Sequence, residues 1–441
     1  IKSAAPGNYS SDSRPYSKPV YSVSPLDRIL KRYSPGAAWA SKPVTMDYLA
    51  NSSDVNCINY SVSSSGALVN NGTYAAGQLR VVKRIGEDQH VSYTFTDKQG
   101  HILLERQMQG SEQHDTYYVY NDLDNLCFVL QPMYQSVSNL DQYAFQYKYD
   151  NRNRCNWKKL PGASAVSYVY DEADNMIFSQ DGKQYASKQW SFYLYDKFHR
   201  LAVQGVCSNT NTAAVSNVIV SCTRVNSNSG LGNSGYTSSF ALVSPEVHRV
   251  NYYDDYAFRS LTGFDNAGFP AATIDAKGYV TGSVITVLGS STKLYSANYY
   301  DFEGRITKTV QGNLLEGYDT TNTVYTFTGK PNTVTHTHTA SGKTTRTEVY
   351  TYTYDHADRI SKVRHSLGGT SITLYDATYD NFGRLLTKQY HGTSTNKLTY
   401  TYNLRSWLTG ISGTRFTQNL YYNTGVGTAK YNGSISSMTW K

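Results

Sequence analysis

The amino-acid sequence predicts an all-β protein in which antiparallel β-hairpins repeat along the chain and pair into a coiled sheet. Three observations predict this fold class. A Tyr-Asp turn motif returns many times, the residues before it alternate between two faces of a strand, and an apolar residue follows it at a fixed distance. Internal repeats of this kind determine the architecture of a whole chain.

The turn motif is clearest in YDNFGRLL at 379–386 and YDFEGRIT at 300–307. Related copies are YDHADRIS at 354–361, YDKFHRLA at 195–202 and YDNRNRCN at 149–156. With the Asp taken as position zero, units can be placed at Asp97, Asn121, Asp150, Asp171, Asp196, Asp254, Asp265, Asp275, Asp301, Asp355, Asp380 and Asn403. Most neighbouring units lie 21 to 29 residues apart, which is the length of one hairpin with its connection.

Position +3 of most units carries a residue that tolerates a positive φ, either Gly or a short polar side chain, with Ala257 and Ser406 as exceptions. An Asp at position zero can accept a hydrogen bond from the backbone two residues later, as in an Asx-turn. A turn that starts in this way and closes on a left-handed residue is a hairpin loop ending in a G1-type bulge. We therefore predict structural repeat turns, with no catalytic, cofactor-binding or metal-binding role, at Asp150, Asn153, Asp171, Asp174, Asp196, Asp301, Gly304, Asp355, Asp358, Asp380 and Gly383.

The segments on either side of the turn have the pattern of strands. In EVYTYTYD, Tyr350, Tyr352 and Tyr354 alternate with Thr351 and Thr353, and position +5 after the turn is apolar in most units. Each unit is therefore predicted to be a hairpin. A single hairpin is marginally stable, so the units should pair edge to edge into a long sheet that curls. We expect the tyrosines to share one face, the concave one, where curvature buries more of each ring.

The composition suits such a sheet and excludes several function classes. The 441 residues include 41 tyrosines, and the mean hydropathy is −0.51, so the chain must bury tyrosine or enclose something polar. The net charge is +8, but no run of Lys and Arg exceeds two residues, which argues against a nucleic-acid partner. No apolar stretch approaches 18 residues, so we expect no membrane span. Both ends look cut, and we expect the chain to be a fragment of a longer protein.

The five cysteines are Cys57, Cys127, Cys155, Cys207 and Cys222. An odd number without a C-x-x-C pair argues against a structural zinc site and against a dense disulfide scaffold. We predict free thiols that pack as small hydrophobic side chains. A disulfide between Cys207 and Cys222, worth about 3 kcal/mol, stays open as the alternative.

The Y-D-x-x-G-R-L motif is that of the RHS, or YD, repeat, and the chain resembles RHS-repeat proteins of Gram-negative bacteria clearly from about residue 90 to 410. The segments SPLDRILKRYSPGAAW, GTYAAGQL and DQYAFQYKYDNRNRCNWKKLPG resemble the N-terminal part of one secreted RHS group. The resemblance implies a strip of β-sheet coiled into a hollow shell that holds a polypeptide, usually a C-terminal toxin. Toxin-complex cocoons, interbacterial Rhs effectors and teneurins share this design. The family's downstream core segment has no counterpart before Lys441, and no toxin domain is visible, so the resemblance extends to the shell and not to an activity.

Four regions are expected along the chain. Residues 1–90 form an irregular, strand-containing lead-in, 91–206 a first YD-repeat array, 207–246 a Ser/Asn-rich loop insertion, and 247–441 a second array that continues beyond the fragment. The insertion should be a solvent-exposed excursion with few sheet pairings, because its Ser, Asn, Thr and Gly residues bury little surface. A β-propeller is the alternative architecture, which the uneven hairpin spacing and the lack of blade motifs disfavour.

Other patterns with chemical potential have plainer explanations. GLGNSG at 230–235 matches G-x-G-x-x-G but is followed by no helix, which favours a flexible loop over a phosphate site. THTHT places His336 and His338 on one strand face at the spacing of two metal ligands, but no Cys or carboxylate lies nearby in sequence, which favours a polar strand face. The tyrosines are predicted to be structural, with carbohydrate stacking as the alternative.

Arginines recur at position +4. Stacked hairpins would align them beside the Asp residues, so we predict a cross-strand ion-pair ladder, with a lining that contacts cargo or anionic glycans as the alternative. The arginines concerned are Arg154, Arg200, Arg305, Arg359, Arg384 and also Arg28, where SPLDRILKRY fits the same frame with Ser24 at position zero.

The function expected from the residues and the resemblance is that of a non-catalytic, secreted or surface-displayed RHS-repeat shell segment. It would encapsulate and help to deliver a C-terminal effector that lies outside this chain. The expected partners are that cargo polypeptide or the secretion machinery, with surface glycans or outer-membrane proteins as further alternatives, and no cofactor, nucleic acid or membrane span is expected. A cell-surface adhesin built from the same repeats is the second hypothesis, and an enzyme is the third.

Overall fold

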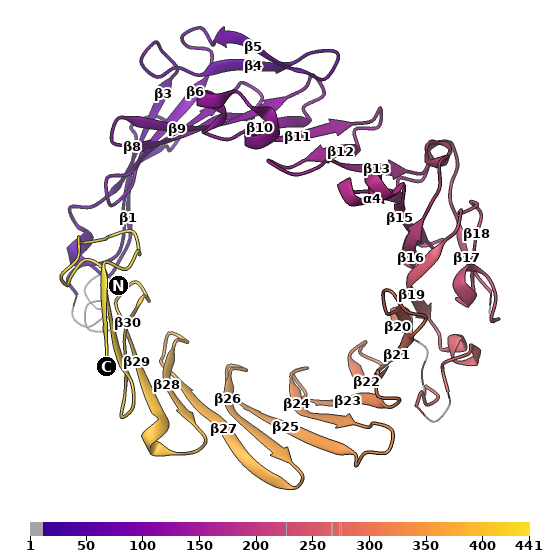
Figure 1. Cartoon of the computed structure of the whole chain (residues 1–441). Helices are drawn as coiled ribbons and strands as arrows, with labels where there is room; N and C mark the ends of the chain where they lie inside the picture. Colours follow the sequence, from indigo (N-terminus) through magenta and orange to yellow (C-terminus); the bar gives the residue numbers. More distant parts are fainter. Residues whose placement is uncertain (1–11, 226, 266–267, 273, 275) are drawn as a thin grey trace. The chain divides into compact units, whose positions relative to one another are not determined.

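The computed structural model describes residues 12–225, 227–265, 268–272, 274 and 276–441. Strands account for 49% and helices for 8% of the residues, and 28 of the described strands belong to one antiparallel sheet. Hairpins follow one another along the chain (Figure 1). The predicted fold class, all-β with repeated antiparallel hairpins, is confirmed. None of the helices in the described residues is long and apolar enough to cross a membrane.

The first of two compact units comprises Ile1–Ala165, Tyr379–Lys388 and Thr395–Lys441. Its N-terminal elements are β1 (Lys18–Tyr21), β2 (Ile29–Tyr33), η1 (Ala37–Trp39), β3 (Val44–Ala50), β4 (Ile58–Val62), β5 (Leu68–Thr73), β6 (Arg80–Ile85), β7 (Val91–Thr96), β8 (Ile102–Gln109), β9 (Glu112–Tyr120), β10 (Leu126–Leu130), α2 (Tyr134–Val137), α3 (Leu140–Tyr143), β11 (Ala144–Tyr149) and β12 (Cys155–Lys159). Its C-terminal elements are β29 (Lys397–Tyr402), β30 (Leu408–Gly413), β31 (Thr417–Tyr421) and β32 (Ser437–Trp440), and β28 (Leu385–Tyr390) and η5 (Ser394–Asn396) cross the unit boundary. Phe95, Leu104 and Leu130 are fully buried in its core, against which the separate β4–β5 hairpin packs.

The second unit comprises Val166–Thr378 and Gln389–Ser394. Its elements are β13 (Val166–Tyr170), β14 (Met176–Gln180), α4 (Gly182–Ser187), β15 (Trp190–Tyr195), β16 (Leu201–Cys207), η2 (Thr212–Asn217), β17 (Cys222–Arg224), η3 (Leu231–Asn233), β18 (Tyr236–Ser238), β19 (Glu246–Asp254), η4 (Ala257–Ser260), β20 (Ala276–Thr286), β21 (Lys293–Tyr300), β22 (Ile306–Gly312), β23 (Tyr318–Tyr325), β24 (Pro331–His338), β25 (Arg346–Tyr354), β26 (Ile360–Leu367) and β27 (Thr370–Tyr379, whose last residue falls in the first unit).

The pairing register places a β-bulge at the Tyr of the Tyr-Asp motif. In hairpin after hairpin the register shifts by one residue at the Tyr that precedes position zero, as at Tyr195, Tyr300 and Tyr354. Such a bulge adds a residue to one strand and increases the local twist. The turn sequence therefore sets both the chain reversal and the twist between neighbouring strands.

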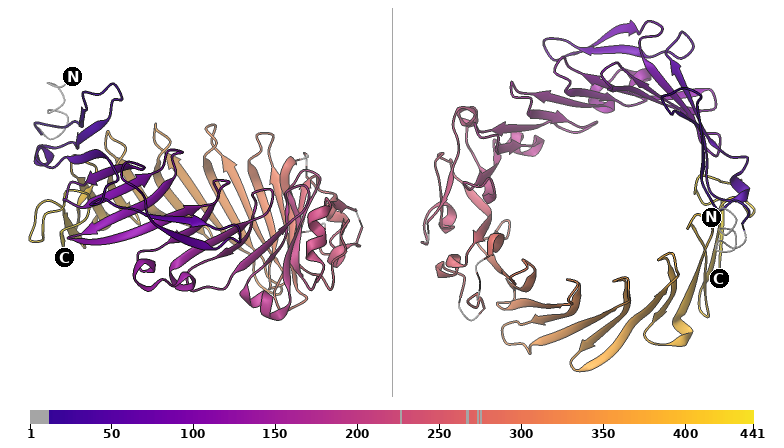
Figure 2. Two further views of the ribbon diagram at one scale, coloured as in Figure 1. Left: turned by 90° about the horizontal axis from the view of Figure 1, so that it is seen from above. Right: turned by 180° about the vertical axis from the view of Figure 1, so that it is seen from behind.

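The second unit has a dense core in one part and a single-layer sheet in another. The buried cluster runs from Ile177 to Val310 and includes Phe178, Phe192 and Phe258. Between residues 312 and 378, by contrast, only Val363 and Ala377 are buried. The left view of Figure 2 draws the strands of this stretch (orange) side by side as successive hairpins. The sheet from β23 to β27 is therefore held by cross-strand contacts and has no apolar core of its own.

The structure corrects the prediction of an exposed insertion at 207–246. Val215, Val220, Cys222 and Tyr236 are buried and join the core of the second unit, and β17 pairs with β18 in a small separate sheet beside β16 and β19 (Figure 1). The average composition misled the prediction because a few apolar residues are interspersed among the Ser, Asn and Thr residues. Those few side chains are sufficient to anchor the segment.

All five cysteines are free thiols, and four of them, Cys57, Cys127, Cys207 and Cys222, are buried. Burial raises the pKa of the Cys57 and Cys222 thiols to about 12, which suppresses the reactive thiolate. We therefore expect N-ethylmaleimide to modify the native protein slowly and at Cys155 first, and to add five labels after unfolding in urea. Mass spectrometry counts the labels. Three labels in the unfolded protein would show that two of the five cysteines form a disulfide, which would contradict the structure.

Candidate functional site: the repeat turn and its clasp

Each regular repeat turn is held together by the Asp at position zero. In the turn of Asp301, the N–H groups of Glu303 and Arg305 both donate to Asp301 Oδ1 at 3.0 Å. The N–H of Asp301 donates to the carbonyl of Arg305, and the N–H of Gly304 donates to the carbonyl of Asp301. The same bonds recur in the turns of Asp150, Asp196, Asp355 and Asp380. The carboxylate thus takes up backbone donors that a tight turn would otherwise leave unpaired.

The residue at position +3 lies in the left-handed region both in these turns and in the turn of Asp171. The φ angle is 59° at Asn153, 65° at Asp174, 78° at Gly304, 56° at Asp358 and 82° at Gly383. Ser406, whose residue type departs from the sequence pattern, also has a positive φ of 62°. The turn of Asn403 therefore keeps the left-handed conformation at position +3, although Ser406 replaces the usual Gly, Asn or Asp.

The turn of Asp171 has a second role, because the insertion docks on it. Asp171 is fully buried, and its Oδ1 accepts the N–H of Asn175 at 2.8 Å. Its Oδ2 accepts the N–H of Val220 at 3.1 Å, and the N–H of Glu172 donates to the carbonyl of Val218. One repeat turn thereby fixes the start of the small β17–β18 sheet.

The arginines at position +4 do not form the predicted cross-strand ladder. The guanidinium turns back over its own turn, so that Arg305 Nε donates to Asp301 Oδ2 at 2.8 Å and Nη2 lies 2.8 Å from the same oxygen. The same i,i+4 pair occurs at Arg154, Arg200, Arg359 and Arg384, whereas Arg28 lies over the ring of Tyr48. The prediction was wrong because the loop brings position +4 closer to position zero than the strand spacing does.

A second contact, which the sequence analysis missed, joins consecutive units through the Tyr at position −1. The hydroxyl of this Tyr donates to the backbone carbonyl at position +5 of the preceding unit. The bonds are Tyr149 to Leu126 (2.8 Å), Tyr253 to Leu201 (2.8 Å), Tyr325 to Ile306 (2.7 Å), Tyr354 to Pro331 (2.7 Å) and Tyr402 to Leu385 (3.0 Å). Each hairpin is therefore pinned to the one before it, which explains why the motif uses Tyr and not Phe.

The position +4 side chain completes this clasp, because it stacks on the ring of the Tyr at −1 in the next unit. Arg200 lies 4.3 Å from the centre of the Tyr253 ring, and Arg305 and Arg384 lie 4.8 Å from their tyrosine rings. Aromatic residues substitute for Arg in other units: His101 on Tyr120, Tyr279 on Tyr300 and Trp407 on Tyr422. Asp at zero, a planar group at +4 and Tyr at −1 thus form one repeating device, which we call the clasp.

The structure also changes the list of units. Thr326 begins a regular turn that the sequence analysis missed, with Gly329 at position +3 (φ 79°). Asp254, by contrast, ends β19 with φ 75° and starts no hairpin turn, since η4 follows and β20 begins at Ala276. Asp265 starts no hairpin either: its Oδ1 accepts the N–H of Gly268, and its Oδ2 accepts the hydroxyl of Tyr318. Asp275 lies outside the described residues.

Substitutions at Gly329 test the requirement for a positive φ at position +3 without introducing a clash. The nearest atom to a new Cβ there is Arg305 Nη1 at 4.0 Å. We expect Gly329→Val to lower the free energy of unfolding by about 1–2 kcal/mol, because a β-branched residue is strained at positive φ, and Gly329→Asn to cost a few tenths. At Gly304 a new Cβ would meet the Tyr279 hydroxyl, so Val and Asn should both destabilise there. Urea denaturation measures the differences. Equal losses for Val and Asn at 329 would contradict the turn geometry.

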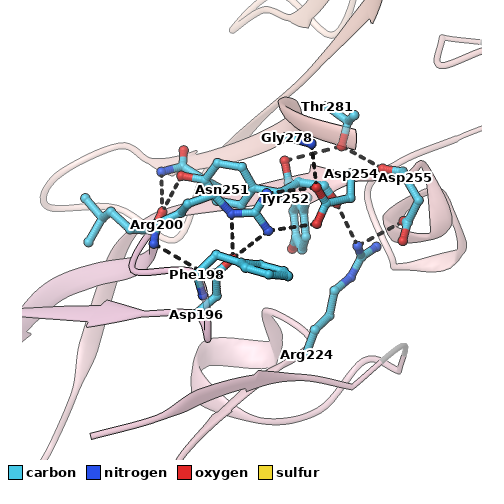
Figure 3. A network of polar contacts seen from close by, with 12 residues as sticks. Asp196, Phe198, Arg200, Arg224, Asn251, Tyr252, Asp254, Asp255, Gly278 and Thr281 are labelled. Carbon is cyan, nitrogen blue, oxygen red and sulfur yellow. Dashed lines mark hydrogen bonds and ion pairs between the residues drawn. The ribbon is translucent and has the colours of Figure 1, made fainter. Parts of the chain in front are cut away.

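The clasp is most elaborate at Arg200, where the insertion meets the sheet of the second unit (Figure 3). Arg200 Nε donates to Asp196 Oδ2 at 2.8 Å, while Nη1 and Nη2 donate to the two oxygens of Asp254 at 2.8 and 2.7 Å. Asp254 also accepts the N–H of Gly278 at 2.7 Å. The hydrogen bonds from Arg200 lower the pKa of Asp254 to about 2, so this carboxylate stays ionised at neutral and mildly acidic pH.

Arg224 of the insertion extends this network. Its Nη1 donates to Asp255 Oδ1 at 2.9 Å, and the carbonyl of Asp255 in turn accepts the hydroxyl of Thr281 at 2.6 Å. A cavity of about 310 Å³ lies between these groups and is lined by Asp196, Arg200, Cys222, Arg224 and Asp254, among others. The three carboxylates face two guanidinium groups and one Lys, which leaves the cavity close to neutral. The Cys222 thiol in the lining stays protonated at neutral pH, because burial raises its pKa to about 12.

The remaining sequence candidates lie apart from the clasp. The GLGNSG segment contains η3 and borders a cavity of about 190 Å³. His336 and His338 share one face of β24, and carboxylates that are distant in sequence, Asp319 and Glu348, lie beside them across the strands. Within the described residues, no group of three or more His, Cys, Asp and Glu side chains could hold a metal ion.

Comparison with known proteins identifies the fold. No protein-family model and no curated protein matches the sequence. The crystal structure of TcdB2-TccC3 aligns with 92% of this chain and 20% of that chain, with a TM-score of 0.55 and 11% sequence identity. The crystal structure of TcdB2-TccC3 without its hypervariable C-terminal region aligns with 91% and 22% of the two chains, at a TM-score of 0.36 and 11% identity. The chain thus spans about a fifth of the length of TcdB2-TccC3 and shares its fold in that part.

Proposed function

We propose that this chain is a segment of an RHS-repeat shell that encloses a polypeptide cargo and helps to deliver it. The cargo would be a C-terminal effector of the same protein, and the shell would be secreted or displayed at the bacterial surface. The role is non-catalytic: the clasp uses its charged groups to join hairpins, and each Asp–Arg pair is satisfied within the turn.

The observation that carries the proposal is the single-layer sheet from β23 to β27. The pairing register puts His336, His365 and Tyr350 on one face and Thr residues such as Thr335 on the other. Only Val363 and Ala377 are buried between residues 312 and 378. A sheet with an ordinary core would have one apolar face covered by a second layer. Amphipathic side chains held in register by backbone ladders and clasps instead suit a wall that contacts a wet, polypeptide-filled space.

Two further observations support the proposal. The sequence carries the YD motif of the RHS repeat, and its fold is that of part of TcdB2-TccC3. The clasp gives a physical reason for a wall of this kind, because it joins each hairpin to the next through hydroxyl–carbonyl bonds and ring stacking without needing a second layer of structure. A wall built in this way can be extended by adding units.

Protease protection in the parent protein tests the proposal. We expect proteinase K to leave the proposed C-terminal effector intact when it is part of the native protein, and to degrade it at once when it is expressed alone. Loss of protection should coincide with unfolding of the sheet in urea. Equal digestion rates for the attached and the isolated polypeptide would refute encapsulation.

A cell-surface adhesin is the second candidate, and exposed aromatic residues at the turn tips favour it. Phe198, Phe302 and Phe327 are 61%, 88% and 104% exposed, respectively. Exposed rings of this size suit contacts with a partner protein or with sugar rings. Replacement of all three by Ser should abolish adhesion to cells if this function holds, and should leave protection of an enclosed cargo unchanged.

A further inference from the structure

Three histidines meet on one face of the sheet in the second unit. His336 and His338 lie two residues apart on β24 and therefore share a face. His336 pairs directly with Glu348 on β25, and Tyr350, two residues further along β25, pairs with His365 on β26. Directly paired residues in an antiparallel sheet lie on the same face, so the register brings all three histidines together.

Each histidine already contacts a polar group of a neighbouring strand. His338 Nδ1 lies 2.5 Å from Asp319 Oδ1, His365 Nε2 lies 3.1 Å from Glu348 Oε2, and His336 Nδ1 lies 2.9 Å from the Thr321 hydroxyl. The ring of Tyr350 packs between His336 and His365, with centroid distances of 5.9 and 4.7 Å. These contacts hold the imidazoles in fixed positions on the sheet.

The face is hollowed and accessible. A depression of about 400 Å³ is lined by Asp319, Thr321, His336, His338, Arg346 and Glu348, among others. The side chains of His338, Asp319 and Glu348 are 43%, 49% and 39% exposed. Every residue that lines the depression belongs to β23, β24, β25 or β26. We call these six residues, with His365 and Tyr350, the histidine face.

The charge of the histidine face depends on pH. Its permanent charges are the guanidinium of Arg346 and the carboxylates of Asp319 and Glu348, which give −1. With three neutral imidazoles the face keeps this charge of −1, and with all three protonated it carries +2. The flanking strands add no charge, since β22 contributes Thr309 and Gln311 and β27 contributes Thr370 and Ile372.

We propose that the histidine face binds an acidic polypeptide segment, and that this binding strengthens as the pH falls. Imidazolium and guanidinium N–H groups are strong donors to carboxylates. The face also carries two carboxylates of its own, which would repel a dense row of phosphates, whereas a peptide spaces its acidic groups between neutral amides. This inference goes beyond the proposed shell function, because it concerns a free peptide and requires no enclosed cargo.

Fluorescence anisotropy with the complete chain and a fluorescein-labelled peptide of alternating Glu and Ser tests the proposal. We expect binding to be about tenfold tighter at about pH 5.5 than at about pH 8, since protonation of the imidazoles turns the net charge of the face from negative to positive. The variant His336→Gln/His338→Gln/His365→Gln should lose this pH dependence. The matched control, His90→Gln/His356→Gln/His391→Gln, replaces three exposed histidines elsewhere and should keep it.

Each outcome decides the proposal. Equal pH dependence in both triple variants, or equally tight binding of labelled oligothymidylate, would overturn it. If the first triple variant fails to fold, as judged by circular dichroism, Arg346→Gln provides the test, because Arg346 is exposed at the first position of β25. This variant should weaken peptide binding several-fold at both pH values, and unchanged binding would likewise overturn the proposal. Failure of the protease-protection experiment would leave these results unaffected.

Discussion

Replacement of Arg405 by Ala should lower the free energy of unfolding by about 3 kcal/mol, because it leaves the buried Glu87 carboxylate without its cationic partner. Arg405 Nη1 lies 3.1 Å from Glu87 Oε1 and donates to the carbonyl of Tyr431 at 2.8 Å. The Glu87 side chain is only 7% exposed. The guanidinium also lies 4.4 Å from the Trp407 ring centre and 5.1 Å from that of Trp39, so the substitution removes two cation–π contacts as well.

The loss should be cooperative, because this junction joins segments of the first unit that are 318 residues apart in sequence. Trp39 Nε1 donates to the carbonyl of Tyr431 at 2.8 Å, and Asp88 accepts the N–H groups of Tyr431 and Asn432 at 2.7 and 3.2 Å. These bonds link the β6–β7 turn and η1 to the chain after β31. A contact between such distant segments restricts the chain far more than a local one does.

Urea denaturation measures the effect, with Arg415→Ala as the matched control. Arg415 is exposed in the same C-terminal region, so its replacement should change stability by less than about 0.5 kcal/mol. The double variant Glu87→Gln/Arg405→Ala should be less destabilised than the sum of its single variants, because the removal of both charges leaves no unpaired carboxylate. Equal stability of Arg405→Ala and Arg415→Ala would show that the junction does not hold the segments together.

The fold could be predicted because its turn chemistry is local. Each hairpin turn contains an Asp that caps the turn and a residue suited to positive φ, so the turns can be recognised in the sequence. Alternating Tyr and Thr residues indicate the strands between the turns. Thr326 was missed because its turn lacks the Asp, although Gly329 was present. Asp254 was wrongly taken as the start of a hairpin turn. It ends β19, and the strand that pairs with β19 there, β20, begins only at Ala276, after η4.

The contacts between units could not be predicted in the same way. The hydroxyl of Tyr354 donates to a backbone carbonyl, and every residue has one, so no side-chain pattern points to the partner. The Arg305 guanidinium turns back toward Asp301 of its own turn because the loop is narrow. The number of residues between Asp301 and Arg305 does not by itself give the width of the loop. The contact of Glu87 with Arg405 and the pairing of His336 with Glu348 depend on how separate strands and loops come together in the folded chain. No local sequence motif indicates such contacts.

The second large effect is expected at Arg200, where one side chain serves two carboxylates. Arg200→Ala should lower the free energy of unfolding by about 2 kcal/mol, a value reduced from that of a fully buried pair because the site is partly exposed. Asp196 and Asp254 would both lose charge-assisted bonds, and the ring of Tyr253 would lose its stacking partner. Arg305→Ala is the matched comparison at the same repeat position. Its loss should be smaller, because Asp301 and the exposed Glu303 are its acidic partners and it has no counterpart to the bidentate pair with Asp254.

The pH dependence of this loss distinguishes the ion pair from simple packing. The hydrogen bonds from Arg200 lower the pKa of Asp254 in the folded protein to about 2, and an unfolded Asp titrates near 3.9. A depressed folded pKa contributes stability that is complete above the unfolded value and is lost as the pH falls through the folded one. The difference between the wild-type protein and Arg200→Ala should therefore be constant from about pH 7 to about pH 5 and shrink between about pH 4 and 2. A difference that persists unchanged at about pH 2 would mean that Arg200 acts through its contact with the Tyr253 ring and not through its charge.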